Sequence, residues 1–180
     1  SMSESYIYAP EKSTFWVRPR ALRQWIEWAK SGHYDSVRVV AHGCAPKSYE
    51  SIVGHPIGFD PFNYGSQQNF GYGTYTSLTT HAAASYTMQK GSNDYRVGQM
   101  VLCLLLCKGD EMPYHPNTHH ASSRTSSLSN MQKPYYRYEF SKSKVKANYE
   151  RSSGERSLWC DAVVVREGSL LLPLGVVVPK

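Results

Sequence analysis

The sequence predicts a single α+β domain, and three stretches carry that prediction. Apolar residues recur at helical spacing from Leu22 to Ala29, which indicates an amphipathic helix. Residues 37–42 are rich in valine, as β-strands are, and residues 99–109 are apolar almost without interruption, as expected of a strand buried on both faces. With 180 residues, of which 41% are hydrophobic, the chain has the size of one domain.

The first half is expected to alternate helices and strands. Pro19 stands near the start of the first predicted helix, a position that proline tolerates, and the strand 37–42 follows. A second helix is predicted over 46–55, again with a proline in its first turn. Residues 56–70 contain prolines, glycines and amides, so they should form an ordered loop.

The middle of the chain predicts a short strand at 73–77 and a helix at 77–90. Ser77 or Thr79 would cap this helix, and three alanines inside it favour the helical state. The buried strand at 99–109 follows, and it should lie centrally in the sheet.

The last third is expected to combine a long polar loop at about 111–155 with two closing strands. These strands are predicted at 161–166 and 169–178, on either side of a turn at Glu167, and Pro173 in the second suits a sheet edge or a bulge. Residues 1–18 would form an N-terminal extension, in which Ser1 before Met2 is typical of a tag remnant. Residues 19–180 would form the domain.

The net charge of +6 lies mostly in one region. Between Arg124 and Arg156 there are eight Lys or Arg and three Glu. Such a patch suits either a solvated loop or an anionic partner. Tyrosines alternate with basic residues over 133–151, which would fit a nucleic-acid surface or an ordinary exposed strand.

Cysteine usage and hydropathy argue for a soluble intracellular protein, nuclear or cytoplasmic. The apolar runs are much shorter than the ~20 residues that span a bilayer, so no membrane association is expected. The four cysteines form no C-x2-C pair and are expected to be reduced. No metal is expected. The weak alternative is a metal site built from Cys103, Cys107, His115, His119 and His120.

Three motifs follow one another in an informative order: AHG at 41–43, GYGTYTS at 71–77 and AAASYT at 82–87. Tyr75 and Tyr86 lie eleven residues apart. In this order and spacing the chain resembles the catalytic domain of PARP-type (diphtheria-toxin-like) ADP-ribosyltransferases. The resemblance implies two packed mixed or antiparallel sheets with short flanking helices around an NAD cleft, and transfer of ADP-ribose from NAD to a protein acceptor.

The resemblance also implies roles for the motif residues. His42 would hydrogen-bond a ribose hydroxyl of the adenosine half, and Gly43 would offer its backbone to the carboxamide of nicotinamide. Tyr75 and Tyr86 would stack on the nicotinamide ring. Two further residues belong to the expected NAD-binding set: Cys44, and Ala83, which stands where many members have serine. Gly71 and Gly73 would allow the sharp turn into the Tyr75 strand, and the 56–70 loop would cover the nicotinamide ribose.

Polymer-forming members carry a glutamate at the start of the penultimate strand, and this chain departs from that pattern. Alignment on Pro173 puts Ala162 in the glutamate position, whereas a slip of one residue puts Asp161 there. Asp161 therefore joins His42 and Tyr75 as a candidate catalytic residue, with Ala162 as the competing register. Both registers argue against polymer formation. Mono-ADP-ribosylation is the expected activity, and an inactive domain that binds NAD, ADP-ribose or a protein partner is the alternative.

Overall fold

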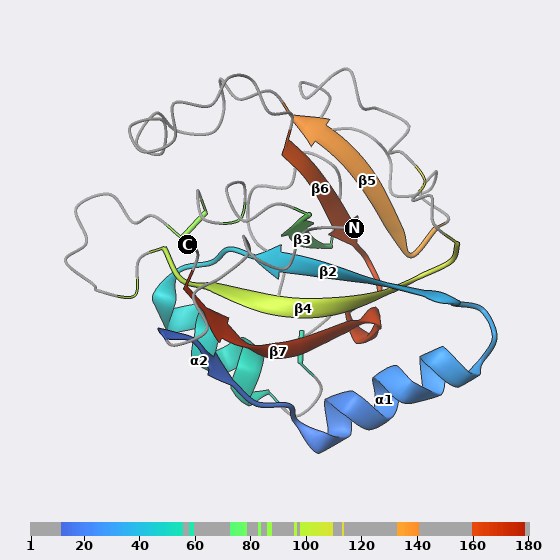
Figure 1. Ribbon diagram of the computed structural model, residues 1–180, viewed down its shortest axis with the longest axis horizontal. Coiled ribbons are helices and arrows are strands. Elements are labelled where there is room, and N and C mark those ends of the chain that lie inside the picture. Colours follow the sequence, from blue (N-terminus) through green and yellow to red (C-terminus); the bar gives the residue numbers. More distant parts are fainter. Residues whose placement is uncertain are drawn as a thin grey trace.

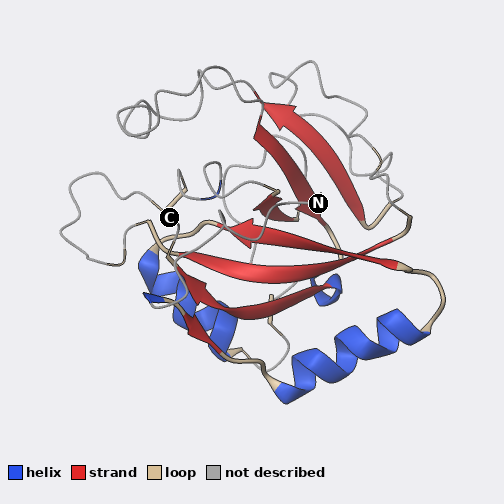
Figure 2. Ribbon diagram, viewed as in Figure 1, coloured by secondary structure: helices blue, strands red, loops and turns tan. Residues whose placement is uncertain are grey.

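The computed structural model describes residues 12–55, 58–59, 73–78, 83, 86–87, 96, 98–109, 113, 133–140 and 160–178. In this part of the chain, seven strands form one open antiparallel sheet accompanied by two α-helices (Figures 1 and 2). The elements are β1 (Thr14–Phe15), α1 (Pro19–Lys30), β2 (Ser36–His42), α2 (Pro46–Gly54), β3 (Thr74–Ser77), β4 (Met100–Cys107), β5 (Tyr135–Phe140), β6 (Cys160–Val165), a 3-10 helix (Gly168–Leu170) and β7 (Leu171–Val177). The α+β class is confirmed.

The strand order is β1-β7-β4-β2-β3-β6-β5, and every neighbouring pair is antiparallel. Of the mixed or antiparallel arrangement that the resemblance implies, the described residues have the antiparallel one, and they form one sheet where two packed sheets were expected. The sheet consists of two groups of strands, β1, β7, β4 and β2 in one and β3, β6 and β5 in the other, and few hydrogen bonds connect the two groups. Strand β2 pairs with β4 from Ser36 to His42, whereas it pairs with β3 only at Ala41, opposite Ser77. In Figure 1, β5 and β6 run steeply across the direction of β2, β4 and β7.

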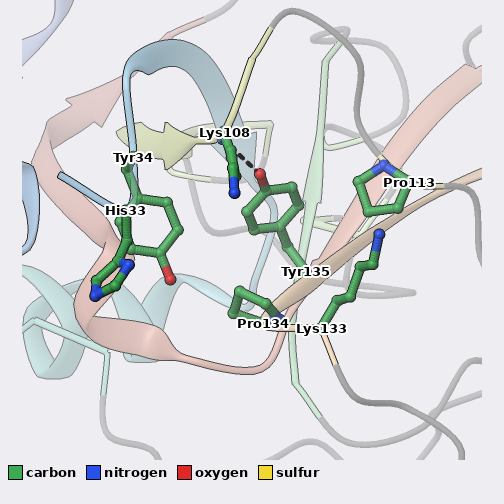
Figure 3. A pocket seen from close by; sticks show the side chains of 7 residues that line it. All are labelled: His33, Tyr34, Lys108, Pro113, Lys133, Pro134 and Tyr135. Atoms are coloured by element: carbon green, nitrogen blue, oxygen red, sulfur yellow. Dashed lines mark hydrogen bonds between the residues drawn. The ribbon is translucent and has the colours of Figure 1, made fainter.

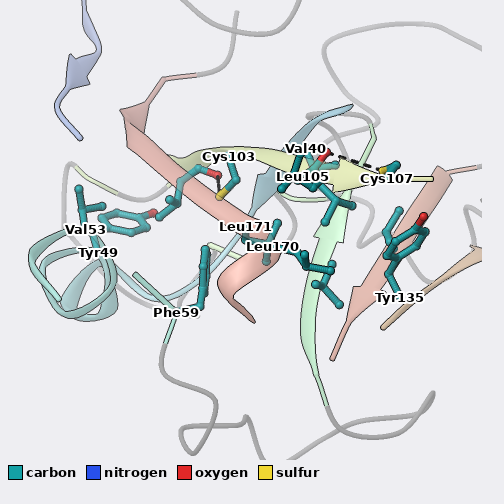
Figure 4. Packing of buried hydrophobic residues seen from close by; sticks show 14 residues of the cluster. Val40, Tyr49, Val53, Phe59, Cys103, Leu105, Cys107, Tyr135, Leu170 and Leu171 are labelled. Atoms are coloured by element: carbon teal, nitrogen blue, oxygen red, sulfur yellow. Dashed lines mark hydrogen bonds between the residues drawn. The ribbon is translucent and has the colours of Figure 1, made fainter. Parts of the chain in front are cut away.

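The main hydrophobic core lies between the helices and one face of the sheet (Figure 4). Strand β4 reads MVLCLLLC, and its alternate residues Cys103 and Leu105 are fully buried in this core. Helix α2 contributes Tyr49 and Val53. Because the other face of β4 is buried too, in a smaller cluster with Met100, the strand needs apolar residues at every position. The uninterrupted apolar run of the sequence is explained by its central place.

Helix α1 is attached to the main core by its apolar stripe and by two indole groups. Trp25 donates its Nε1–H to the carbonyl of Leu170 over 3.0 Å, and Trp28 donates to Oγ of Ser169 over 2.7 Å. Both acceptors belong to the 3-10 helix that precedes β7. The helix thus packs its tryptophans inward while their polar N–H groups are satisfied.

Strand β7 has neighbours on both sides, and its register is irregular at Pro173. Leu102 pairs with Gly175 and Cys103 with Pro173, so Leu174 is passed over in the ladder with β4. Of the two predicted alternatives for Pro173, the bulge is confirmed, and β7 is not an edge strand. On its other side, a Cβ on Gly175 would overlap the carbonyl oxygen of Thr14, so glycine permits the close approach of β1.

Two features of the sheet differ from the sequence-based expectation, and a third is its strand order, which the sequence did not predict. Strand β5 lies inside the region expected to be one long polar loop, 111–155. Strand β1 lies within the segment 1–18, so the sheet begins before the expected domain boundary. Strands β6 and β7, although separated by only a short turn, belong to different ends of the sheet, because β6 pairs with β3 and β5 while β7 pairs with β4 and β1.

Neither helix in the described ranges has the length and apolar character needed to cross a membrane.

Candidate functional site

His42 ends β2 at the narrow connection between the two groups of strands. Its Nδ1 lies 2.7 Å from the carbonyl oxygen of Tyr75 in β3. Burial lowers the pKa of His42 below its ordinary value of 6.5, and the hydrogen bond to the Tyr75 carbonyl opposes that shift only in part. The imidazole is therefore neutral at pH 7.

The Tyr75 carbonyl fixes the tautomer of this imidazole. A carbonyl oxygen only accepts hydrogen bonds, so Nδ1 must carry the proton and Nε2 of the neutral ring keeps its lone pair. Phe59 holds the ring from the side, with the two ring centroids 5.2 Å apart and the planes at 84°. The site thus presents an oriented acceptor nitrogen, suited to a hydroxyl donor.

Gly43 follows His42 and lies directly against the segment that carries Tyr86. A Cβ on Gly43 would overlap the carbonyl oxygen of Ala83 and would lie 3.1 Å from Cβ of Tyr86. The Tyr86 N–H donates to that same Ala83 carbonyl over 3.1 Å. Ala83 is buried, whereas 59% of Tyr86 is exposed. Only glycine allows this approach, so the backbone of 42–43 and the Ala83–Tyr86 turn form one corner.

Tyr75 joins this corner through its backbone and packs its half-buried ring in a separate cluster. That cluster contains Ala162 and Val164 of β6 and Tyr136 of β5. Tyr75 pairs with Val164 in the ladder of β3 and β6. Side chains of directly paired residues lie on the same face of a sheet, which agrees with this grouping.

The register of β6 bears on the choice between Asp161 and Ala162. Ala162 pairs with Ser77, two residues from Tyr75, and therefore belongs to the same set of alternating positions as Tyr75. Asp161 pairs with Glu139 and belongs to the other set, together with Val163. The residue that shares the face of Tyr75 is an alanine.

Cys44 lies on the core side of the corner. It is half-buried and packs against the main core, and burial raises the pKa of its thiol to about 12. The thiols of Cys103 and Cys107 are buried in β4, where burial raises their pKa values as well. Thiols with raised pKa values are poor nucleophiles and poor metal ligands at neutral pH. The histidines of the alternative metal site, His115, His119 and His120, lie outside the described residues, and the described residues contain no cluster of metal-ligating side chains.

The proposed nucleic-acid surface loses two of its tyrosines. Tyr135 and Tyr136 open β5 and are only 4% and 6% exposed, one in the main core and the other beside Tyr75. They cannot stack on bases from solvent, and β5 does not begin as an exposed strand. Most of the basic region 124–156 and of the 56–70 loop lies outside the described residues, as does most of the predicted helix 77–90.

Phe59 is the site residue that sequence reasoning missed. It lies within the stretch predicted as a loop, and it is 6% exposed in the main core while contacting His42. Gly58, which precedes it, has a φ of +80°, and a Cβ on Gly58 would lie 3.0 Å from Cδ of Pro173 in β7. The Gly-Phe pair inside a polar segment was the available signal, since a large apolar residue after a turn glycine often anchors a loop.

Neither the protein-family models nor the curated proteins searched gave a match to this chain.

Proposed function

We propose that this chain is a PARP-type ADP-ribosyltransferase domain that transfers single ADP-ribose units from NAD to a protein acceptor and releases nicotinamide. The observation that supports this proposal is the meeting of three separate motifs at one corner: His42 hydrogen-bonds Tyr75, and Gly43 abuts Ala83 and Tyr86. The corner has the oriented imidazole and the close backbone approach that binding of a dinucleotide needs. The activity would belong to the nucleus or the cytoplasm, where NAD is available.

Each residue of the corner has a distinct task in this proposal. The lone pair on Nε2 of His42 accepts a hydrogen bond from a ribose hydroxyl, which sets the position of the dinucleotide. Gly43 offers its backbone to the carboxamide. Tyr86, which is exposed at the corner, supplies an aromatic face to the nicotinamide ring, and Tyr75 supplies the exposed part of its ring from the cluster that it shares with Ala162. Each contact is worth about 1 kcal/mol beyond burial.

The reaction breaks the bond between the ribose C1′ and the nicotinamide nitrogen, and the bonding electron pair leaves with nicotinamide. Positive charge develops on the sugar, and an acceptor oxygen or nitrogen then attacks C1′ and loses its proton. A carboxylate near the sugar would stabilise that charge. Because Ala162 occupies the position on the face of Tyr75, the acceptor's own acidic group would serve instead, which suits mono-ADP-ribosylation and not polymer growth.

A second candidate function is a binding module that has lost turnover and retains a pocket for NAD, ADP-ribose or a protein partner. Ala162 and Ala83 favour it, since neither offers a polar group where active relatives of the proposed family carry glutamate and serine.

NAD-induced thermal stabilisation would test the binding step common to both functions. We expect NAD at about 1 mM to raise the melting temperature of the wild-type domain, because ligand that binds only the folded state stabilises it. His42→Ala and Tyr86→Ala should each lose most of this shift, and Glu27→Ala, at an exposed position of α1, should keep it. Absence of a shift in the wild type would overturn the proposed NAD site.

Automodification with labelled NAD then separates the enzyme from the binding module. We expect one ADP-ribose for each modified side chain, seen by mass spectrometry, and we expect Asp161→Asn to retain transfer, since Asp161 does not share the register set of Tyr75. NAD binding without any transfer would support the binding module. Loss of transfer in Asp161→Asn, with NAD binding intact, would show that Asp161 is the catalytic carboxylate.

A further inference from the structure

A cavity of about 600 Å³ lies at the end of β4 away from His42 (Figure 3). Two tyrosines, two lysines and two prolines line it together with His33. Tyr34 immediately precedes the β2 region and His42 ends that strand, so about 20 Å of extended chain separates them. The cavity is not part of the corner at His42.

The aromatic walls of this cavity are held in place by the fold. Tyr135 is 4% exposed, and its hydroxyl oxygen accepts the backbone N–H of Lys108 over 2.7 Å. Tyr34 packs edge-on against Trp28 of α1, with ring centroids 5.8 Å apart. Burial raises the pKa of both phenols, and the Glu167 carboxylate adds to the shift at Tyr34. Both rings are therefore neutral and fixed before any ligand arrives.

The charged side chains that line the cavity are positive, and no carboxylate in the described residues forms an ion pair with them. Lys108 and Lys133 contribute ammonium groups, and their side chains lie on either side of Tyr135 in the view of Figure 3. Neither forms an ion pair within the described residues, where the salt bridge present joins Arg96 to Glu50. Two carboxylates lie near the lining, Asp35 close to Tyr135 and Glu167 close to Tyr34, and both accept hydrogen bonds from neutral groups. Asp35 accepts the Gly109 N–H, and Glu167 accepts from the backbone and hydroxyl of Ser169.

We propose that this cavity is a second binding site, for a small aromatic anion of the size of a mononucleotide. Its volume lies in the range of small-molecule sites, about 300–1,000 Å³, and far exceeds the space that a free phosphate needs. The half-buried ring of Tyr34 and the two prolines offer flat faces to a base, because stacking on aromatic rings tolerates any base. The lysines suit a phosphate as point charges. The site is independent of the proposed NAD corner.

Isothermal titration calorimetry with AMP, adenosine and inorganic phosphate tests this proposal on the whole chain. We expect AMP to bind with a Kd of about 1 mM or tighter, and adenosine and phosphate to bind at least tenfold more weakly, since each offers half of the required chemistry. Lys108→Gln combined with Lys133→Gln should weaken AMP binding at least tenfold. Lys47→Gln, an exposed lysine on α2, is the matched control and should leave it unchanged.

AMP is also half of NAD, so the same titration is made with His42→Ala. AMP affinity that survives in His42→Ala and falls in the double lysine variant supports the second site, whatever becomes of the proposed NAD corner. Three results would overturn it: no AMP binding at millimolar concentration, AMP binding that depends on His42 and ignores both lysines, or phosphate that binds as tightly as AMP. Circular dichroism of the lysine variants, expected to match wild type, shows that they fold.

Discussion

The two groups of strands in this sheet differ in how far their strands are paired with their neighbours. Strands β7, β4 and β2 are long and paired along most of their length, and the two helices cover one face of them. Strands β3, β6 and β5 pair well with one another, but β3 is short and connects to β2 only through Ala41 and Ser77. The His42–Tyr75 hydrogen bond adds a second connection beside that pair. The candidate site therefore lies where the sheet has its fewest ladder bonds, and its geometry depends on a few contacts.

The largest effect is expected from Gly43→Val, which would break the corner itself. The new side chain would overlap the Ala83 carbonyl, a backbone group that cannot rotate away. We expect the free energy of unfolding to fall by about 4 kcal/mol, measured by urea denaturation. Gly54→Ala at the end of α2 is the control, because its Cβ would meet only Arg18 at an ordinary 3.6 Å and should change stability by about 0.5 kcal/mol or less. Equal effects of the two changes would show that Gly43 is not tightly enclosed.

Native-state hydrogen exchange would sharpen the comparison of the two groups. Val164→Ala removes two buried methyl groups in β6 and should lower the opening free energy of amides in β3, β5 and β6 by about 2 kcal/mol. Amides of β4 should change by less than about 0.5 kcal/mol, because Val164 packs in the cluster with Tyr136 and Ala162 and not in the main core. Leu105→Ala in β4 is the matched change in the other group and should weaken protection throughout the sheet by about 3 kcal/mol. An equal loss in β4 for Val164→Ala would make the sheet one cooperative unit.

The smallest effect concerns the pH dependence of stability at the connection. Since burial lowers the pKa of His42 in the folded state, the unfolded chain takes up its proton first as the pH falls below about 6.5. Stability is therefore unaffected by this group above pH 7 and declines as the pH falls from 6.5. We expect His42→Gln to lose less stability than wild type between pH 7 and 5.5 in urea denaturation. Identical curves for the two proteins would mean that His42 titrates alike in both states.

Elements with strong local signals were predictable from the sequence. The stripe Leu22 to Ala29 after Pro19 gave α1, and the apolar run of β4 gave a central strand, because in both cases burial follows directly from the spacing of apolar residues. The candidate site was partly predictable for the same reason. A strand that ends in His-Gly presents both residues at a sheet end, where the structure has them.

Other features depend on contacts that no short window contains. Strand β5 was hidden in a polar region because its tyrosines look exposed until β6 and the core cover them. That Ala162, and not Asp161, shares the face of Tyr75 follows from the pairing of Ser77 with Ala162, a long-range register that one residue of slip would reverse. Phe59 was missed because its role comes from a neighbour, His42, seventeen positions earlier.

The indoles that attach α1 also give the protein an optical readout of its own. Trp25 and Trp28 bond to the 3-10 helix that leads from β6 to β7, and Trp16 donates to the Val53 carbonyl at the end of α2. The emission of a tryptophan depends on how its ring is solvated and bonded. These three of the four tryptophans thus report on the contacts between the helices and the sheet, and a change in those contacts would appear as a spectral shift without any added label.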